Sequence, residues 1–399
     1  MRILFLASAL PSPVSVSGFI VIYERIRHLV LRKHEVGLAC FVPANTEFHE
    51  EPEIASMLFE LETVPLPRRS AARIAFDPFA STVPAAFRTL SCKAMQMVAG
   101  EMVRRSSYDV VIAEFSQMGQ YLHRNPYLPP VRRIISCHSC YTTSAKNQLK
   151  VQHGIFSKLA TVLSLPALER YEFDMYRNAD HVVVLTPEER QDLHHYDPSL
   201  RISISPYGVD TNHYKPNAAV RREQAIVFTG YYSHLANQDA VLWFVRSVWP
   251  ALRTRYPDLR FYVVGRGPTR DLMDLARKDS RIVVTGEVED LSDYLAKAAA
   301  FICPIRMGKG QRGKVLQAMA AGVPVVSTSL AAEGISAQSG HNILLADTPH
   351  TMSESICLLL DEAALSTAIA ERGRQLATTK YSWPRCVDRL EEALHKVVR

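Results

Sequence analysis

The chain alternates short apolar runs with stretches whose apolar positions recur every three to four residues. The runs predict β-strands. In the N-terminal half they are Ile3–Ala7, Val36–Phe41, Val110–Ala113, Ile134–Ser136, His181–Leu185 and Ile202–Ser205. In the C-terminal half they are Ile226–Thr229, Arg260–Val264, Ile282–Thr285, Ala300–Pro304 and Pro324–Ser327. Continuous rather than alternating apolar runs are typical of strands that are covered on both faces.

The stretches between the runs predict helices. Asp239–Arg255 and Leu291–Ala298, for example, have helical apolar spacing. Strands that alternate with helices indicate parallel sheets with helices on both faces. Because the two series are separated by turn residues in 206–216, we predict two doubly wound α/β domains, with the first in residues 1–210 and the second in residues 211–382.

The first apolar run leaves two interpretations open. Arg2, the apolar residues that follow and Ala7-Ser8-Ala9 have the features of a short signal peptide. The same residues fit a buried strand, Arg2–Ser8, that leads through a Pro/Ser/Gly loop into a helix from about Phe19. The later strands repeat this order of run, loop and helix, which favours the strand.

Composition and charge narrow the class of protein. The 399 residues are 47% hydrophobic and carry a net charge of +6, which indicates a globular chain suited to anionic ligands rather than a nucleic-acid binder. No apolar run approaches the length of a membrane span. The seven cysteines lack the spacing of a disulfide framework, so we expect a cytoplasmic protein. No Asp-x-Asp motif is present, so we predict no metal site.

The candidate chemistry is concentrated after the strand Ala300–Pro304. A glycine-rich basic loop there leads into a helix that begins near Gly313 and closes at Gly322; the loop and helix start comprise Gly308, Lys309, Gly310, Gln311, Arg312, Gly313 and Lys314. Backbone N–H groups and the dipole at a helix start attract anions. We expect a diphosphate there, with Arg312 and Lys314 as cations and a hydroxyl-bearing group beside Gln317. A solvated basic loop is the alternative.

These residues resemble a known family. Gly310–Gly322, Pro324–Thr328 and Ala332–Ile335 resemble the donor-binding segment of the family 4 retaining glycosyltransferases, closest to the branch found in exopolysaccharide and exosortase-associated loci. The resemblance continues through Tyr207–Asp210, Phe228–Gly230, Phe261–Pro268, Val284–Val288 and Tyr381–Trp383. It implies the GT-B fold, in which two Rossmann-like domains face a central cleft and the last helix, here 383–399, packs back on the first domain.

The resemblance also implies the site, residue by residue. His138, Arg312 and Lys314 are the expected catalytic residues. The expected nucleotide-sugar contacts are Gly18, Gly230, Tyr231, Arg266, Val288, Lys309, Gly310, Gln311, Gly313, Gln317, Glu333 and Gly334. Gly18 stands where the family brings backbone N–H groups near the diphosphate, and His138 where many members place a histidine near the donor sugar. Glu114, after its strand, is a weaker candidate for contact with the acceptor.

Three features depart from the family pattern. Lys309 and Gln317 stand where the family usually has glutamates, and Gln317 is expected to weaken or alter nucleotide binding. The Arg/Lys pair that commonly follows the first donor-domain strand is missing, since Gly230 is followed by Tyr231. Arg312 and Lys314 must then carry most of the leaving-group charge.

The implied activity is retaining, metal-independent transfer of a sugar from a UDP- or GDP-linked donor to an acceptor hydroxyl in polysaccharide or glycoconjugate biosynthesis, without a cofactor. The acceptor is a glycan, a lipid-linked molecule or a small molecule. Basic residues occur together at 68–69, 73, 104–105 and 132–133. They allow two interpretations: peripheral contact with the inner face of the membrane, or a basic surface that is only solvated.

Three rival interpretations stay open. In the first, the chain is a catalytically weak or inactive relative that acts as a partner. In the second, it is a different enzyme on the same scaffold, such as a sugar-nucleotide epimerase or a phosphorylase. The third, a nicotinamide-dependent Rossmann enzyme, is supported only by Gly265-Arg266-Gly267, which lacks the third glycine of the dinucleotide-binding motif.

Overall fold

The computed structural model describes residues 1–13, 18–44, 53–67, 83–151, 155–220, 222–308 and 310–398. The chain forms two compact units, one of Met1–Ser205 with Val387–Arg399 and one of Pro206–Cys386. The change of unit comes at residue 206, slightly before the expected 210. The reason is local, because Val209 pairs with Ser382 and the Tyr207 ring packs on Trp383 at 5.5 Å, all within the second unit.

The first unit is built on one parallel sheet. Its described strands, in spatial order, are β3 (Glu60–Pro65), β2 (Glu35–Val42), β1 (Arg2–Ala7), β4 (Val110–Glu114), β5 (Arg132–Cys137), β6 (His181–Val184) and β7 (Ile202–Ile204). The first apolar run is therefore a strand, and its residues 3–7 are fully buried in the middle of the sheet. Continuous apolar runs are expected there, since helices cover both faces.

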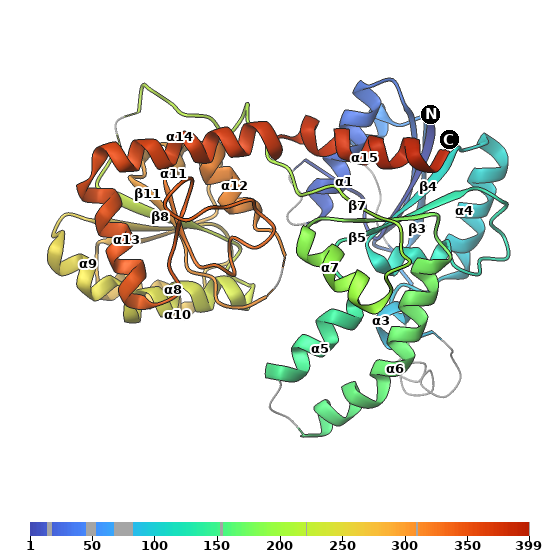
Figure 1. Cartoon of the computed structure of the whole chain (residues 1–399), viewed down its shortest axis with the longest axis horizontal. Helices are drawn as coiled ribbons and strands as arrows, with labels where there is room; N and C mark the ends of the chain where they lie inside the picture. The colour runs from blue at the N-terminus through green and yellow to red at the C-terminus, as the bar shows by residue number, and fades with distance from the viewer. Residues whose placement is uncertain are drawn as a thin grey trace. The chain divides into compact units, whose positions relative to one another are not determined.

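The helices of the first unit connect these strands. They are α1 (Gly18–Leu31), η1 (Glu53–Met57), α3 (Ala85–Arg88), α4 (Lys93–Ser106), η2 (Ser116–Tyr121), α5 (Tyr141–Val151), α6 (Ile155–Arg177) and α7 (Pro187–Tyr196), with most of α15 (Trp383–Val398). In Figure 1, α5 and α6 form a hairpin that extends away from the strands of this unit. The C-terminal helix returns to the first unit, because Val387, Leu390 and Leu394 are buried in the same cluster as Ile3 and Phe5.

The second unit repeats the design. Its sheet runs β10 (Ile282–Gly286), β9 (Arg260–Val264), β8 (Ala225–Thr229), β11 (Ala300–Cys303), β12 (Val325–Ser327) and β13 (Leu344–Leu345), and all pairs are parallel. Helices α8 (Leu235–Ser247) and α10 (Arg270–Lys278) lie on one side of the strands, and α12 (Gly313–Ala320) and α14 (Ala363–Lys380) on the other (Figure 1). The remaining helices are α9 (Trp249–Arg255), α11 (Leu291–Lys297) and α13 (Pro349–Asp361).

The prediction of two doubly wound α/β domains is confirmed, with three local differences. Strand β3 was not predicted, because its glutamates alternate with other residues at the edge of the sheet and leave no continuous apolar run. Strand β13 has only two residues. The stretch Asp239–Arg255 is two helices rather than one, and the break falls at Val248, two residues before Pro250, which lacks the N–H that a continuous helix needs.

Candidate functional site

Sheet order places the candidate site of the second unit. Strand β8 lies between β9 and β11, so the chain leaves β8 toward one side of the sheet and later continues from β11 toward the other. The loops that follow β8 and β11 diverge at this point, and ligands of doubly wound sheets bind where such loops diverge. Gly230 and Tyr231 follow β8, while Arg312 and Lys314 follow β11. Residues far apart in the sequence are thus brought to one sheet edge.

Lys314 points its ammonium group at the end of β8. Its Nζ donates to the Thr229 carbonyl at 2.6 Å and to Asn237 Oδ1 at 2.7 Å, and it lies 4.4 Å from the centre of the Phe228 ring. Burial lowers the pKa of Lys314 to about 8, and the positive charge of Arg312 acts in the same direction. An ammonium group with three N–H donors and two protein acceptors keeps one donor for a ligand. This is a cation that an anion would stabilise.

Arg312 and Glu333 each present a buried polar atom that has no partner in the described part of the chain. The atoms are Arg312 Nε and Glu333 Oε2. Arg312 uses Nη2 to donate to the Met307 and Gly308 carbonyls at 3.3 and 2.6 Å, so its guanidinium is anchored to its own loop. Burial lowers the pKa of Arg312, and the Glu333 carboxylate partly offsets this. Unsatisfied buried polar groups are costly, and a polar ligand would satisfy both.

Glycines hold the loops of this edge close together. A Cβ on Gly265 would lie 2.0 Å from the Gly230 carbonyl oxygen, and one on Gly230 would lie 3.2 Å from Lys314 Nζ. The Arg266 guanidinium stacks 4.7 Å from the centre of the Tyr231 ring, and the Tyr231 carbonyl accepts from Asn237 at 2.8 Å. Asn237 therefore ties together the loop after β8 and Lys314.

The start of α12 is covered by Tyr207. The Tyr207 N–H donates to Gln311 Oε1 at 2.9 Å, and Gln311 Nε2 donates back to the Tyr207 carbonyl at 3.3 Å. A Cβ on Gly313 would lie 2.5 Å from the Tyr207 ring. Gly313 is therefore required by the packing of the Tyr207 ring. The Gln311 side chain is already engaged by backbone.

The remaining expected contacts are more scattered. Gln317 is half-buried on α12, and Val288 packs against the hydrophobic core after β10. Gly310 and Gly334 have φ of +103° and +76°, which favours glycine at both positions. The Gly334 carbonyl accepts from the Tyr381 hydroxyl at 3.4 Å. Lys309 lies outside the described residues.

The first unit has a second candidate site at its own point of divergence, between β1 and β4. A Cβ on Gly18, the first residue of α1, would lie 2.6 Å from the Phe115 ring and 3.0 Å from His138 Nδ1. The Phe115 and His138 rings lie 4.3 Å apart, and Phe115 has φ of +69°, a strained value for this residue type. Strain of this kind is concentrated at functional sites.

His138 is held by a buried carboxylate. Its Nε2 donates to Glu114 Oε2 at 2.7 Å, while Nδ1 is buried with no partner among the described residues. Burial lowers the pKa of His138, although the adjacent carboxylate opposes this shift. With the proton on Nε2, the neutral ring offers Nδ1 as a hydrogen-bond acceptor beside Gly18.

Glu114 serves the interior of the first unit and not an acceptor, which corrects the weaker expectation. It is fully buried, and its Oε1 lies 2.9 Å from Arg25 Nη1. Arg25 also donates to Ser136 Oγ at 2.7 Å and to the Ser205 carbonyl at 3.0 Å. Burial alone would raise the pKa of Glu114, but Arg25 and His138 bring it down to about 2. Arg25 and Phe115 were missed because an arginine on an amphipathic helix and a phenylalanine after a strand carry no local signal.

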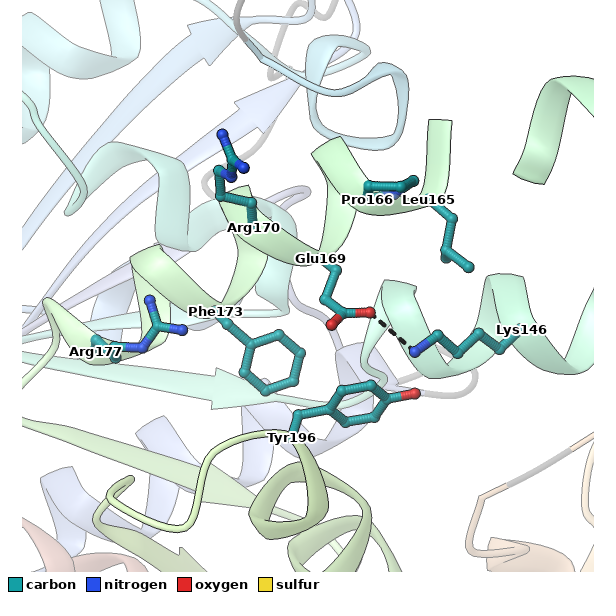
Figure 2. Close-up of a pocket in the computed structure, with 8 residues that line it drawn as sticks. All are labelled: Lys146, Leu165, Pro166, Glu169, Arg170, Phe173, Arg177 and Tyr196. Atoms are coloured by element: carbon teal, nitrogen blue, oxygen red, sulfur yellow. Dashed lines mark hydrogen bonds and ion pairs between the residues drawn. The ribbon is translucent and has the colours of Figure 1, made fainter. Parts of the chain in front are cut away.

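The described residues hold neither a cluster of metal ligands nor a membrane-spanning helix. No three His, Cys, Asp or Glu side chains lie together as metal ligands there, and no helix is long and apolar enough to cross a membrane. A separate pocket of about 490 Å³ lies among α5, α6 and α7 (Figure 2). Its Lys146 is paired with Glu169 at 2.9 Å and lies 4.2 Å from the Tyr196 ring centre, and none of the expected site residues lines it.

Comparison with known proteins identifies the family. The family model described as "Glycosyltransferase Family 4" matches residues 19–213, and the one described as "Glycosyl transferases group 1" matches residues 223–362. An uncharacterized 44.6 kDa protein in the cps region of Klebsiella pneumoniae is 21% identical over 354 residues, which cover 87% of each chain.

Solved structures agree on the fold. Sucrose-phosphate synthase from Thermosynechococcus elongatus superposes with a TM-score of 0.75 at 15% identity over 99% of both chains. Anabaena HepE, solved in complex with UDP, superposes with a TM-score of 0.69 at 14% identity over 99% of this chain and 100% of its own. With family models on both halves and GT-B neighbours over its whole length, the chain belongs to the family 4 glycosyltransferases, and its cps-region relative agrees with the exopolysaccharide branch that the motifs indicated.

Proposed function

We propose that the chain transfers a sugar, with retention, from a nucleotide diphosphate sugar to an acceptor hydroxyl. The observation that carries the proposal is the set of polar groups at the β8–β11 edge that are incompletely satisfied: Lys314 with a lowered pKa, and Arg312 Nε and Glu333 Oε2 without partners. A diphosphate accepts hydrogen bonds from Lys314 and Arg312, while a sugar hydroxyl donates to Glu333. The UDP bound to the HepE structure supports a nucleotide of this class.

The chemistry follows from where charge develops. Breaking the anomeric C–O bond leaves negative charge on the departing diphosphate, and cations fixed before the reaction stabilise it most effectively. Lys314 is fixed by Thr229 and Asn237, and Arg312 by its own loop carbonyls. We infer attack on the same face of the sugar, with the leaving phosphate taking the acceptor proton. Glu114 is enclosed by Arg25 and His138, so we do not assign it as a nucleophile.

The first unit supplies the polar group that we assign to the sugar or the acceptor. With the proton on Nε2, His138 Nδ1 can only accept a hydrogen bond beside Gly18, so a ligand that pairs with it must be a donor such as a hydroxyl. The same proposal includes a UDP- or GDP-linked donor, independence of metals and cofactors, and a role in polysaccharide or glycoconjugate synthesis. It also includes peripheral contact with the inner face of the membrane.

Calorimetric titration with UDP and with GDP tests the donor site. Arg312→Ala and Lys314→Ala should each weaken binding of the preferred nucleotide by roughly 10- to 100-fold, because each removes a charge-assisted hydrogen bond. Arg277→Ala, on the exposed face of α10, is the matched control and should bind as the parent does. Unchanged affinity in both site variants would show that the phosphate was placed wrongly.

Steady release of nucleotide from a panel of UDP-, GDP- and ADP-sugars tests the enzyme itself. The parent chain should turn over at least one donor, and Lys314→Ala should slow that turnover in parallel with its loss of affinity. Tight nucleotide binding without any turnover, across donors and acceptors, would favour the inactive partner instead.

A further inference from the structure

The helical hairpin of the first unit carries an apolar surface that no described residue of the unit covers. In Figure 1, α5 and α6 extend away from the strands, and in sequence they connect β5 to β6. The inner side of α6 is accounted for, because Leu168 and Phe173 are buried in the core and Leu165 packs against it. The 23-residue α6 is longer than this packing requires.

The outer side of α6 presents a stripe of large aliphatic side chains. Leu159, Val162 and Leu163 are 55%, 51% and 73% exposed, and Leu163 is the most exposed large hydrophobic side chain in the described part of the chain. Their spacing of three and four residues places them on one face of the helix. Single exposed leucines are ordinary, but three in one stripe on a projecting helix indicate a contact surface. We call these three residues the α6 stripe.

The charge around the α6 stripe has one sign. The sequence contains no Asp or Glu from Phe115 to Leu168, so the whole hairpin up to the middle of α6 lacks carboxylates. Lys158 is exposed next to Leu159, and Arg170 is exposed about two helical turns after Leu163. Figure 2 shows Arg170 and Pro166 on α6, with Lys146 turned toward Glu169 and therefore already paired. The stripe is thus apolar, with Lys158 and Arg170 beyond its two ends, and the Glu169 carboxylate beside Arg170 is paired with Lys146.

Two of the basic spots suggested by the sequence alone, 104–105 and 132–133, contain an arginine that is paired with carboxylates on its own surface. Residues 68–69 and 73 lie outside the described part of the chain. Arg105 is paired with Glu60 and Glu62, and Arg132 is paired with Asp180. Arginines that are paired with carboxylates on their own surface have little charge left for an anionic partner.

We propose that the α6 stripe docks on an anionic lipid bilayer, with Leu159, Val162 and Leu163 in the interfacial region and Lys158 at the headgroups. Apolar side chains on one face, with basic residues beside them and no carboxylates, are the features that bind a helix to such a surface. A second copy of the chain is a poorer occupant, since stripe against stripe would bring the basic residues Lys158 and Arg170 toward basic residues of the copy in either helix direction. The proposal deepens the peripheral contact included in the proposed function by naming its surface.

Co-sedimentation with vesicles tests the assignment. The full chain should sediment with phosphatidylcholine vesicles that contain phosphatidylglycerol, and less with phosphatidylcholine alone. Leu159→Asp with Leu163→Asp should lower the affinity at least tenfold. Leu31→Asp, at a residue 62% exposed on α1 of the same unit, is the matched control and should bind as the parent does. Lys158→Glu should weaken binding only to the anionic vesicles.

Several results would overturn the proposal. Failure of the parent chain to sediment with anionic vesicles at both low and high salt is one, and equal binding by the double variant is another. Self-association of the parent that the double variant abolishes, measured by sedimentation velocity without vesicles, would assign the stripe to a second copy. Circular dichroism must show that the double variant is folded before its binding is interpreted. If the double variant is unfolded, the exposed substitution Lys158→Glu provides the test instead.

The vesicle test of the α6 stripe and the nucleotide test of the donor site can fail independently. Titration with UDP in the absence of vesicles should give the same affinity for the parent and for the Leu159→Asp, Leu163→Asp variant, because the α6 stripe and Lys314 lie in different units. Vesicle binding without nucleotide binding would refute the proposed donor site and leave the stripe standing. Nucleotide binding without vesicle binding would do the reverse.

Discussion

Lys314 shows how a single residue combines sequence signal and tertiary environment. Its place after a glycine-rich loop marks it as a candidate phosphate ligand, but its protonation is set by the buried position between Thr229 and Asn237. A cation whose charged form is disfavoured by burial gains most when an anion binds beside it. The same residue therefore links nucleotide binding to pH.

The first prediction follows from this link. The pKa of Lys314 is about 8 when folded, against an ordinary 10.5, so burying its charge costs stability below pH 8 and the cost fades as pH rises from 8 to 10.5. Since a bound diphosphate favours the charged form, UDP affinity should fall as pH rises above about 8, and binding should take up a proton there. The diphosphate of UDP is fully ionised throughout this range.

Calorimetry in two buffers of different ionisation enthalpy measures that proton. Lys314→Met should bind more weakly and without proton uptake between pH 8 and 10. If the variant and the parent take up the same number of protons, another group is responsible.

The Arg25–Glu114 pair gives a second prediction at this scale. Glu114→Gln should lower the free energy of unfolding by about 3–5 kcal/mol, because it leaves the Arg25 charge buried without its partner. The control is Glu62→Gln, whose half-exposed pair with Arg105 should cost no more than about 1 kcal/mol. Urea denaturation measures both.

The pH dependence of the parent provides a further check on this pair. The folded pKa of Glu114, about 2, lies below its ordinary 4.5, so its stabilisation is present above pH 4.5 and is lost as pH falls toward 2. The Glu114→Gln variant should lack this contribution. Parallel acid-unfolding curves for parent and variant would contradict the assignment.

At the scale of elements, the most consequential placement is that of α15. The helix begins at Trp383 in the second unit, but from Val387 onward it belongs to the first. Its apolar face is buried in the cluster around β1 and α1, and Arg32 of α1 pairs with Asp388 and Glu391 at 2.6 and 2.5 Å. Apolar periodicity predicts such a helix, but only packing shows which sheet it covers.

The third prediction concerns this helix. Leu390→Ala should destabilise the first unit by about 2–5 kcal/mol, since Leu390 is fully buried and the change leaves a cavity. Glu392→Ala, on the exposed face two residues later, should change stability by less than about 0.5 kcal/mol. Chemical denaturation followed by circular dichroism compares the two. Equal, small effects would mean that α15 contributes little to the core.

At the scale of the whole molecule, the chain contains two sheets of the same winding order, and each holds candidate chemistry where its strand order diverges. The second unit provides cations, and the first provides a histidine acceptor beside Gly18. The expected donor site thus depends on loops from one unit, while the histidine depends on the other.

Hydrogen exchange provides the fourth prediction. Saturating UDP should slow amide exchange most in residues 229–237 and 303–316 of the second unit, because these loops surround Lys314 and Arg312. Residues 110–138 of the first unit should change less with UDP alone than with an intact nucleotide sugar. Protection confined to the first unit would place the nucleotide elsewhere.

Much of the fold was predictable because its physical causes are local. Continuous apolar runs, helical spacing and the Gly322 stop predicted most strands and the α12 helix. The strand β3 was not predictable in this way, since Glu60 and Glu62 satisfy their charge with Arg105, a residue far along the chain. The break at Val248 shows that a proline can divide one apolar pattern into two helices.

The sequence by itself determined the α/β class, the two-unit plan, the family and the basic loop of residues 308–314, because these depend on periodicity and on motifs contiguous in the chain. Only the tertiary structure decided that Glu114 is buried between Arg25 and His138, that Tyr207 covers Gly313, and that Asn237 holds Lys314. These relations join residues tens of positions apart, so they arise from sheet order and packing, which no local pattern encodes.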